Sequence, residues 1–174
     1  MPYVSLVQLA ELPGARELGQ VASTEHTAVV DPELMDRTLR GGDTSSWSAD
    51  EVALADQAKR RIESTVAETD ALIDGYIARR VTLPLDASAE AVLVPIARAI
   101  VRYELHKHIL AAERDHPIVR DYANAQARLR EIRDGKLTLG TTDPAAAGNP
   151  ATMGDVQFVA DPAVFGRDQL RGFR

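Results

Sequence analysis

Apolar residues recur three or four positions apart along residues 49–81, and this spacing predicts a single long amphipathic helix. Ser48 and Glu51 form a capping-box pattern that opens this helix. The other faces carry charged side chains, so we expect one stripe of the helix to be buried against other helices. The members of this stripe are Val52, Ala55, Ile62, Val66, Thr69, Ile73 and Tyr76.

Residues 70–85 end this helix and set the approach of the next one. Apolar positions keep helical spacing as far as Ile77, and the segment at 81–83 is rich in β-branched residues. Pro84 disfavours the α conformation at Leu83, so the helix has to stop before it. Gly75 costs about 1 kcal/mol relative to alanine in a helix interior, which indicates that another backbone passes close to it.

Two more main helices follow along the chain. Pro95 either starts the first of them or kinks a continuous helix. Residues 115–117 break and restart the chain, and Gly135 ends the second helix. The predicted buried positions are Ile96, Ala99, Ile100, Tyr103 and Leu110 in the first, and Ile118, Tyr122, Ala125, Leu129 and Ile132 in the second. Each of the three main helices thus carries one tyrosine, namely Tyr76, Tyr103 or Tyr122.

Short helices are predicted before the long one. Ser5 and Gln8 form a capping box, which predicts a helix over residues 6–12 that Pro13-Gly14 ends. The apolar residues within 21–30 show no clear periodic spacing. Residues 31–33 (Asp-Pro-Glu) open a second short helix that Gly41-Gly42 stops, with Leu34 and Leu39 turned inward. We therefore expect a mainly α fold, a small helical bundle of about three main helices plus short N-terminal ones.

The last part of the chain differs in character. We divide the chain into a helical domain, residues 1–140, and a flexible linker with an interaction arm, residues 141–174. Residues 156–160 have a strand pattern that can add a β-strand to a neighbouring chain. All three phenylalanines lie in this arm, where we expect partner-binding residues. These are Phe158, Phe165, Leu170, Arg171 and Phe173. The alternative is an arm folded back on its own helices.

Composition narrows the classes of function. The chain has 174 residues, a net charge of −6 and no cysteine, so disulfides and cysteine-type zinc sites are excluded and a reducing cytoplasm is the default compartment. No apolar run approaches the ~20 residues of a membrane span. Acidic side chains dominate residues 1–97 and basic ones residues 98–136. Bulk nucleic-acid binding is therefore disfavoured, although a basic patch on the third main helix stays open.

The sequence offers few groups for catalysis. Glycine-rich phosphate loops, nucleophile elbows and His-Glu-x-x-His motifs are all missing. Asp70 and Asp74 lie one helical turn apart, as do Glu104 and His108, and such pairs can hold a metal ion. The alternative is that the carboxylates and nearby arginines orient the helices or meet across a subunit boundary. These arginines are Arg79, Arg80, Arg98 and Arg102. We expect no catalytic residue, no metal and no cofactor.

Residues 70–85 resemble the signature of the Mu-like prophage neck protein family. The positions that carry the resemblance are Asp70, Asp74, Gly75, Tyr76, Arg79, Arg80, Leu83 and Pro84, followed in order by Pro95, Tyr103, Tyr122 and Gly135-Lys136. The likeness covers residues 48–140 well and the termini loosely, and residues 165–173 also resemble the closing segment of the family. Residues 21–47 depart from it, because family members often have a shorter acidic loop there.

The resemblance implies a function without enzyme activity. Members of the family are similar to the head-tail connectors, also called adaptors or head completion proteins, of long-tailed phages. It implies a homo-oligomeric ring of twelve copies in the neck of the virion, assembled in the host cytoplasm. The portal protein would lie above the ring and a stopper or tail-terminator protein below. DNA would only pass through the channel, and no membrane would be involved. A helical DNA-packaging or DNA-binding regulator and a metal-dependent enzyme remain the alternatives.

Overall fold

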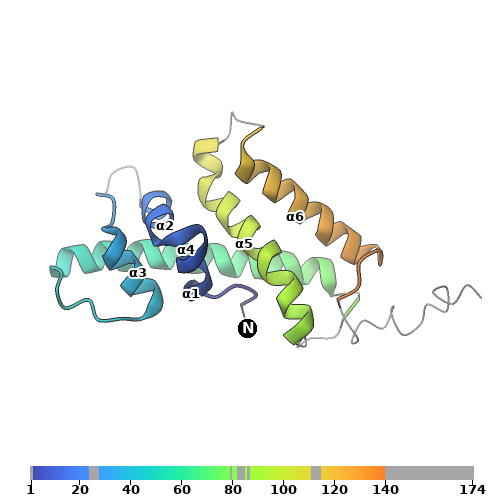
Figure 1. Ribbon diagram of the computed structural model, residues 1–174, viewed down its shortest axis with the longest axis horizontal. Helices are drawn as coiled ribbons and strands as arrows, with labels where there is room; N and C mark the ends of the chain where they lie inside the picture. The colour runs from blue at the N-terminus through green and yellow to red at the C-terminus, as the bar shows by residue number, and fades with distance from the viewer. Residues whose placement is uncertain are drawn as a thin grey trace, which may run out of the picture.

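The computed structural model describes residues 2–23, 28–78, 80–81, 85, 87–110 and 115–139 (Figure 1). This part of the chain is helical and contains no β-strand, which confirms the mainly α prediction. The elements are α1 (Leu6–Leu9), the π-helical turn η1 (Ala10–Gly14), α2 (Ala15–Ala22), α3 (Pro32–Arg40), α4 (Ala49–Ile77), α5 (Ala87–Leu110) and α6 (Pro117–Arg133). The arm predicted at 141–174, its strand, and Arg79, Leu83 and Pro84 lie outside the described residues.

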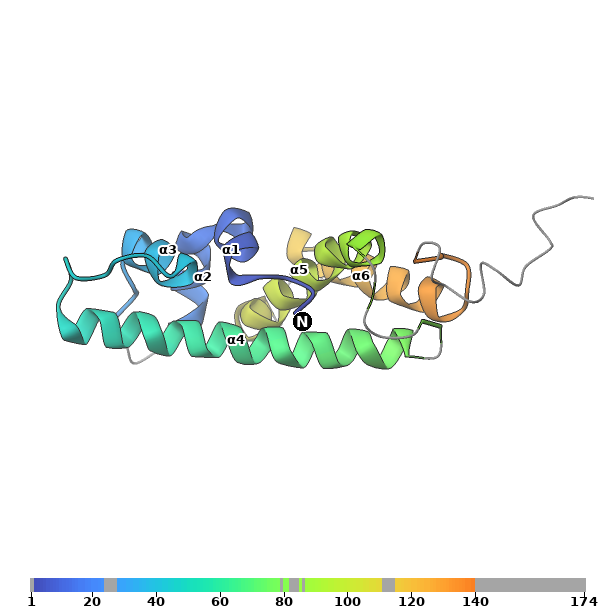
Figure 2. The ribbon, with the colours of Figure 1, turned by 90° about the horizontal axis from the view of Figure 1, so that it is seen from below.

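The long helix α4 supports all the others. Figure 2 shows the remaining helices along one side of α4, with α1, α2 and α3 over its first half and α5 and α6 over its second half. The buried residues of α4 form a single stripe: Ala55, Ala58, Ile62, Val66, Thr69, Ile73 and Ile77. The hydroxyl of Thr69 donates to the carbonyl of Thr65 at 2.8 Å, so this polar side chain is satisfied inside its own helix.

The predicted start of α4 is confirmed and its predicted end is not. Ser48 and Glu51 form the capping box, with the Glu51 backbone N–H donating to Ser48 Oγ at 3.3 Å. The helix ends at Ile77 rather than at residue 81. A Cβ atom built on Gly75 would meet no atom within 4 Å among the described residues. Contrary to the expectation, no backbone of the described residues therefore passes close to Gly75.

The N-terminal helices differ from the prediction at Pro13-Gly14. Helix α1 ends at Leu9, Leu12 is extended with φ −149° and ψ 117°, and Gly14 has φ 108°. The chain then resumes a helix, α2, so Pro13-Gly14 interrupts a helical region rather than ending it. Helix α2 was missed, although its buried residues Leu18, Val21 and Ala22 have helical spacing.

Helix α3 forms as its sequence signals predict. Asp31 Oδ1 accepts hydrogen bonds from the backbone N–H groups of Glu33 and Leu34, both at 3.0 Å. Gly41 follows the helix with φ 69°, a conformation that suits glycine. Leu34 and Leu39 are 1% and 4% exposed, which confirms that this helix turns them inward.

The last two helices form a hairpin over the second half of α4. Pro95 lies inside α5, so of the two alternatives the structure shows a helix that continues through Pro95 rather than one that starts there. Helix α6 begins after His116, whose Nδ1 accepts from the backbone N–H of Ile118 at 3.3 Å, and Gly135 follows its end with φ 74°. In the described part of the chain, no helix has both the length and the apolar character needed to cross a bilayer.

We predict that the Ile73→Ala variant loses about 2–5 kcal/mol of unfolding free energy, because Ile73 is fully buried and truncation leaves a cavity. Urea denaturation of the purified chain measures this loss. The matched control is Leu72→Ala on the same helix, since Leu72 is 38% exposed and should cost less than about 1 kcal/mol. Equal losses in the two variants would contradict the burial of this stripe of α4.

Candidate functional site

Two carboxylates of α4, Asp70 and Asp74, join the N-terminal segment to this helix by hydrogen bonds. The backbone N–H of Tyr3 donates to Asp70 Oδ1 at 3.1 Å, and the Tyr3 hydroxyl donates to Asp74 Oδ1. Partial burial raises the pKa of Asp70 from its ordinary value, and the hydrogen bond from Tyr3 opposes that shift. Burial and the Asp74 carboxylate raise the pKa of the Tyr3 hydroxyl. Both carboxylates are thus occupied by one tyrosine.

The three tyrosines of the main helices meet through Gln126. The rings of Tyr103 and Tyr122 stack with their centroids 4.0 Å apart and 14° between their planes. The Tyr76 hydroxyl donates to Gln126 Oε1 at 3.2 Å, and Gln126 Nε2 donates to the Tyr122 hydroxyl at 3.2 Å. This network joins α4, α5 and α6.

Arg80 fastens the end of α4 to the end of α6. Its Nε–H donates to the carbonyl oxygen of Arg133 at 3.0 Å, where a cation also suits the negative end of the helix dipole. A Cβ atom on Gly135 would lie 1.6 Å from Arg80 Nη2, so glycine leaves the room that the guanidinium occupies. Arg133 in turn has its guanidinium 6.0 Å from the centre of the Tyr76 ring.

A second polar link, between α2 and α5, was not predicted. Glu17 accepts two hydrogen bonds from Arg102, from Nε at 2.6 Å and from Nη2 at 2.8 Å. His106 Nε2 lies 3.4 Å from the same carboxylate. The hydrogen bonds to Glu17 raise the pKa of Arg102. Sequence reasoning missed this site because it did not predict α2, which carries Glu17.

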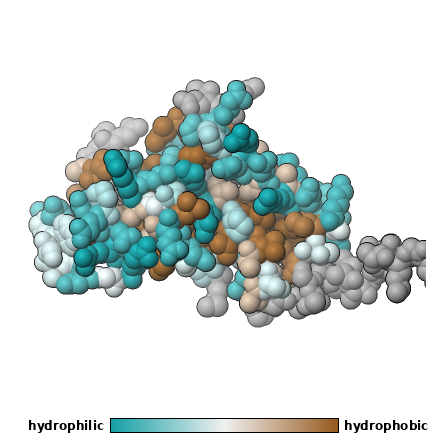
Figure 3. All heavy atoms as spheres, viewed as in Figure 1, coloured by the Kyte–Doolittle hydropathy of each residue, from teal (hydrophilic) through white to brown (hydrophobic). Residues whose placement is uncertain are grey.

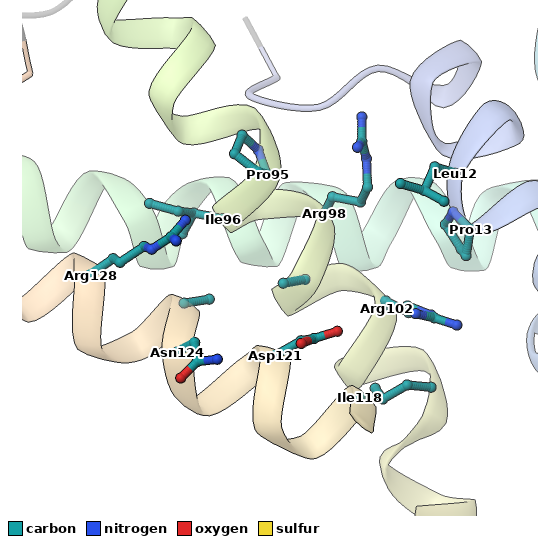
Figure 4. Close-up of a pocket in the computed structure, with 12 residues that line it drawn as sticks. Leu12, Pro13, Pro95, Ile96, Arg98, Arg102, Ile118, Asp121, Asn124 and Arg128 are labelled. Carbon is teal, nitrogen blue, oxygen red and sulfur yellow. The ribbon is translucent and has the colours of Figure 1, made fainter. Parts of the chain in front are cut away.

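An elongated groove lies between η1, α5 and α6, with a volume of about 300 Å³ (Figure 4). Residues from η1 and α5 line one side and residues from α6 the other. They are Leu12 and Pro13 from η1, Pro95, Ile96, Arg98, Ala99 and Arg102 from α5, and Ile118, Asp121, Asn124, Ala125 and Arg128 from α6. The groove therefore combines apolar walls with three arginines and one carboxylate.

Arg98 lacks the partner that Arg102 has. Its Nε is buried and has no hydrogen-bond acceptor in the part of the chain that the structure describes. Figure 4 shows Arg98 extending from α5 on the side of Leu12, whereas Arg128 reaches from α6 toward Ile96. A buried donor without an acceptor costs about 1–3 kcal/mol, and more when it is charged. The Arg98 side chain as a whole is partly exposed, so the groove contains a cationic guanidinium with which an external carboxylate could pair.

The pairs considered as metal ligands do not converge. Among the described residues, no group of three or more histidine, aspartate and glutamate side chains could hold a metal ion. Asp70 and Asp74 face Tyr3, and Glu104 pairs with Lys107 on its own helix. His108 is exposed. The metal-dependent alternative therefore has no assembled site in this part of the chain.

The surface carries two further features. Figure 3 shows a hydrophobic area right of centre, where the ribbon has α5 and the end of α6 in front of α4. Arg120, Arg128 and Arg130 are exposed on α6, where they give this helix a basic outer face. The residues predicted to bind a partner, Phe158, Phe165, Leu170, Arg171 and Phe173, lie outside the described residues.

Together these features define a helical protein whose segments are joined by polar contacts and which carries a groove lined by apolar residues and arginines. Residues 3–158 match the family described as Bacteriophage Mu, Gp36, and the chain belongs to this family. It is also 32% identical over 111 residues to "Gene product J" of Escherichia phage Mu, an alignment that spans 64% of this chain and 74% of that protein. No solved structure matches the chain.

The predicted resemblance to a Mu-like phage protein family is thus confirmed. The match includes residues 21–47, where the sequence departs from the pattern, and it ends at residue 158. Residues 165–173, which resemble the closing segment of the family, lie beyond it.

We predict that Gly135→Ala costs more unfolding free energy than Gly41→Ala. Both glycines have positive φ, so each alanine adds about 1–2 kcal/mol of backbone strain. Only at Gly135 does the new Cβ also displace Arg80, while the space at Gly41 is open. Losing the Arg80 hydrogen bond adds about 1 kcal/mol. Urea denaturation measures both costs, and in an Arg80→Ala background the two should become equal. A persistent difference there would contradict this role of Arg80.

We predict that Asp70→Asn gains stability relative to the natural chain as the pH rises from 3 to 7. The pKa of Asp70 is raised in the folded state, so ionising this carboxyl opposes folding. That penalty is absent below the unfolded pKa, about 3.9, and fully present above the raised folded pKa. Asparagine keeps an oxygen that can accept from Tyr3. Unfolding free energies at pH 3 and pH 7 give the comparison, and a difference that stays constant with pH would contradict it.

Proposed function

We propose that this chain is a structural protein of the virion, a head-tail connector that forms a ring under the portal and joins the capsid to the tail of a long-tailed phage. The observation that carries the proposal is the match to a phage Mu family across residues 3–158. The resemblance of residues 70–85 to the neck protein signature gives the finer assignment. In this role the chain is not an enzyme and works through contacts with other proteins.

The fastened helices suit a subunit of a ring. Tyr3 joins the N-terminal segment to α4, Glu17 joins α2 to α5, and Arg80 joins α4 to α6. These links fix the angles between the helices, and a closed ring forms only if every copy keeps the same shape. The chain would thus act as a rigid wedge around the channel axis.

The charge distribution favours contacts between copies. The uncovered side of α4 lies opposite the layer that contains α6 (Figure 2). Acidic residues outnumber basic ones among the exposed residues of α4, with Asp50, Glu51, Asp56, Glu63 and Glu68 against Arg60 and Arg61. In α6 the balance is reversed, with Arg120, Arg128, Arg130 and Arg133 against Asp121 and Glu131. An acidic face of one copy would meet the basic face of the next.

The partners follow from this placement. Twelve copies would form the ring in the neck of the virion, with the portal protein above and a stopper or tail-terminator protein below, and DNA would only pass through the channel. The arm, residues 141–174, would add contacts through its phenylalanines. Many equivalent weak contacts in one ring give a high total affinity.

One observation favours a second candidate, a DNA-packaging or DNA-binding regulator. The exposed arginines of α6 could contact phosphates. The net charge of −6 for the whole chain opposes this function, because it repels the DNA backbone.

We predict that the full-length chain assembles on purified portal rings of its own phage, and that truncation after Gly140 reduces this assembly at least about tenfold by removing the arm. Electron microscopy of the mixtures and native mass measurement count the bound copies. Circular dichroism of the truncated chain controls for folding. An intact chain that leaves the portals bare would contradict the connector function. A truncated chain that assembles as fully as the intact one, and supports infectious particles, would contradict the role of the arm.

A further inference from the structure

The groove between η1, α5 and α6 carries positive charge that the described residues leave uncompensated. Arg98 has a buried Nε without an acceptor. Arg102, in the same groove, is already bound by Glu17 at 2.6 Å and 2.8 Å. Asp121 is the one carboxylate among the lining residues. The groove is therefore suited to a partner that brings a carboxylate to Arg98.

The same groove offers an apolar surface beside Arg98. Leu12, inside η1, is 55% exposed. Pro13, Pro95 and Ala99, which are exposed or partly exposed, continue the apolar lining. A volume of about 300 Å³ can hold one or two large side chains. A fitting partner segment thus combines a carboxylate with large apolar side chains.

Residues 158–165 of this chain have that chemistry. The sequence reads Phe-Val-Ala-Asp-Pro-Ala-Val-Phe, so Asp161 is its only charged residue and a phenylalanine stands at each end. A segment of this kind complements a cationic groove with apolar walls. Buried aromatic side chains contribute affinity, and the ion pair fixes the position of the segment along the groove.

The length of the arm lets it reach a neighbouring copy. The chain leaves the described residues at Leu139, after the C-terminal end of α6, and the groove extends along α6 from Ile118 to Arg128. Residues 140–157 can span up to about 60 Å when extended at about 3.3–3.6 Å per residue. This span exceeds the length of α6, about 25 Å for its 17 residues, and in a ring of equivalent copies it also brings the groove of the next copy within reach.

We propose that this groove binds residues 158–165 of a neighbouring copy, with Asp161 paired to Arg98 and a phenylalanine against Leu12 and Ala99. This inference rests on the proposed ring for the presence of neighbours. It gives the arm a defined receptor on the helical domain, so that each copy holds the next one.

Site-directed cross-linking tests this arrangement, because the chain contains no cysteine and every introduced thiol is unique. Two full-length variants with different tags are mixed and oxidised: Asn124→Cys, exposed in the groove, and Ala163→Cys, between the two phenylalanines. We expect a disulfide between differently tagged chains. The matched control replaces the groove cysteine by Ala67→Cys, exposed on the uncovered side of α4, and should cross-link at least about tenfold less.

The outcomes separate this inference from the proposed function. Equal cross-linking from the groove and from α4 would overturn the groove as the receptor. A cross-link that forms only when both cysteines are in one chain would overturn docking on a neighbour. Oligomers that assemble without the groove cross-link would overturn the inference and leave the ring intact.

Exchanging the two charges tests the proposed ion pair between Arg98 and Asp161. Arg98→Glu in the groove chain, or Asp161→Arg in the arm chain, should each lower the cross-linking yield about tenfold, and the two together should restore it. Arg98→Gln gives a second variant without a new charge, and circular dichroism checks that each variant keeps its helices. Two exchanged charges that fail to restore the yield in folded chains would overturn the pairing of Arg98 with Asp161.

Discussion

A helix of 29 residues such as α4 is about 44 Å long, and no single short helix can cover its buried stripe. The rest of the structure follows from this constraint. One group of helices, α1 to α3, covers the first half, and the α5–α6 hairpin covers the second. Ile62 and Ile73, both fully buried, represent the two halves of the stripe. Among the described residues nothing covers the opposite side of α4, so this part of the chain forms a one-sided layer rather than a symmetrical bundle.

Polar contacts then fix how the two groups sit on α4. Tyr3, Arg80 and the pair of Glu17 with Arg102 each join segments that are distant in the sequence. Glu17 and Arg102 keep only 26% and 33% of their side chains exposed, so the cost of desolvating the two charges offsets much of their attraction. The directed hydrogen bonds of this pair instead select one arrangement of α2 and α5. For a subunit of the proposed ring, a defined shape matters more than a large unfolding free energy.

Local signals in the sequence predicted the helices that have clear caps and a regular apolar period. Asp31 and Gly41 delimit α3, and Ser48 starts α4, as expected. Helix α2 was missed because Pro13-Gly14 resembles a stop, whereas the chain only makes a π-helical turn there. The groove could not be predicted from the sequence either, because it forms only where η1, α5 and α6 pack together. A single sequence shows the apolar period and the capping residues of each helix. It does not show which distant residues pair in the fold, such as Glu17 with Arg102.

The central claim is that this chain forms the ring between portal and tail. Imaging the neck of intact virions by electron cryo-microscopy, at a resolution that traces helices, tests it most directly. The account predicts repeated copies of the long α4 helix with the layer of shorter helices on one side, placed directly below the portal. A complete neck in which every density is explained by other proteins, in particles that lack this chain, would contradict it.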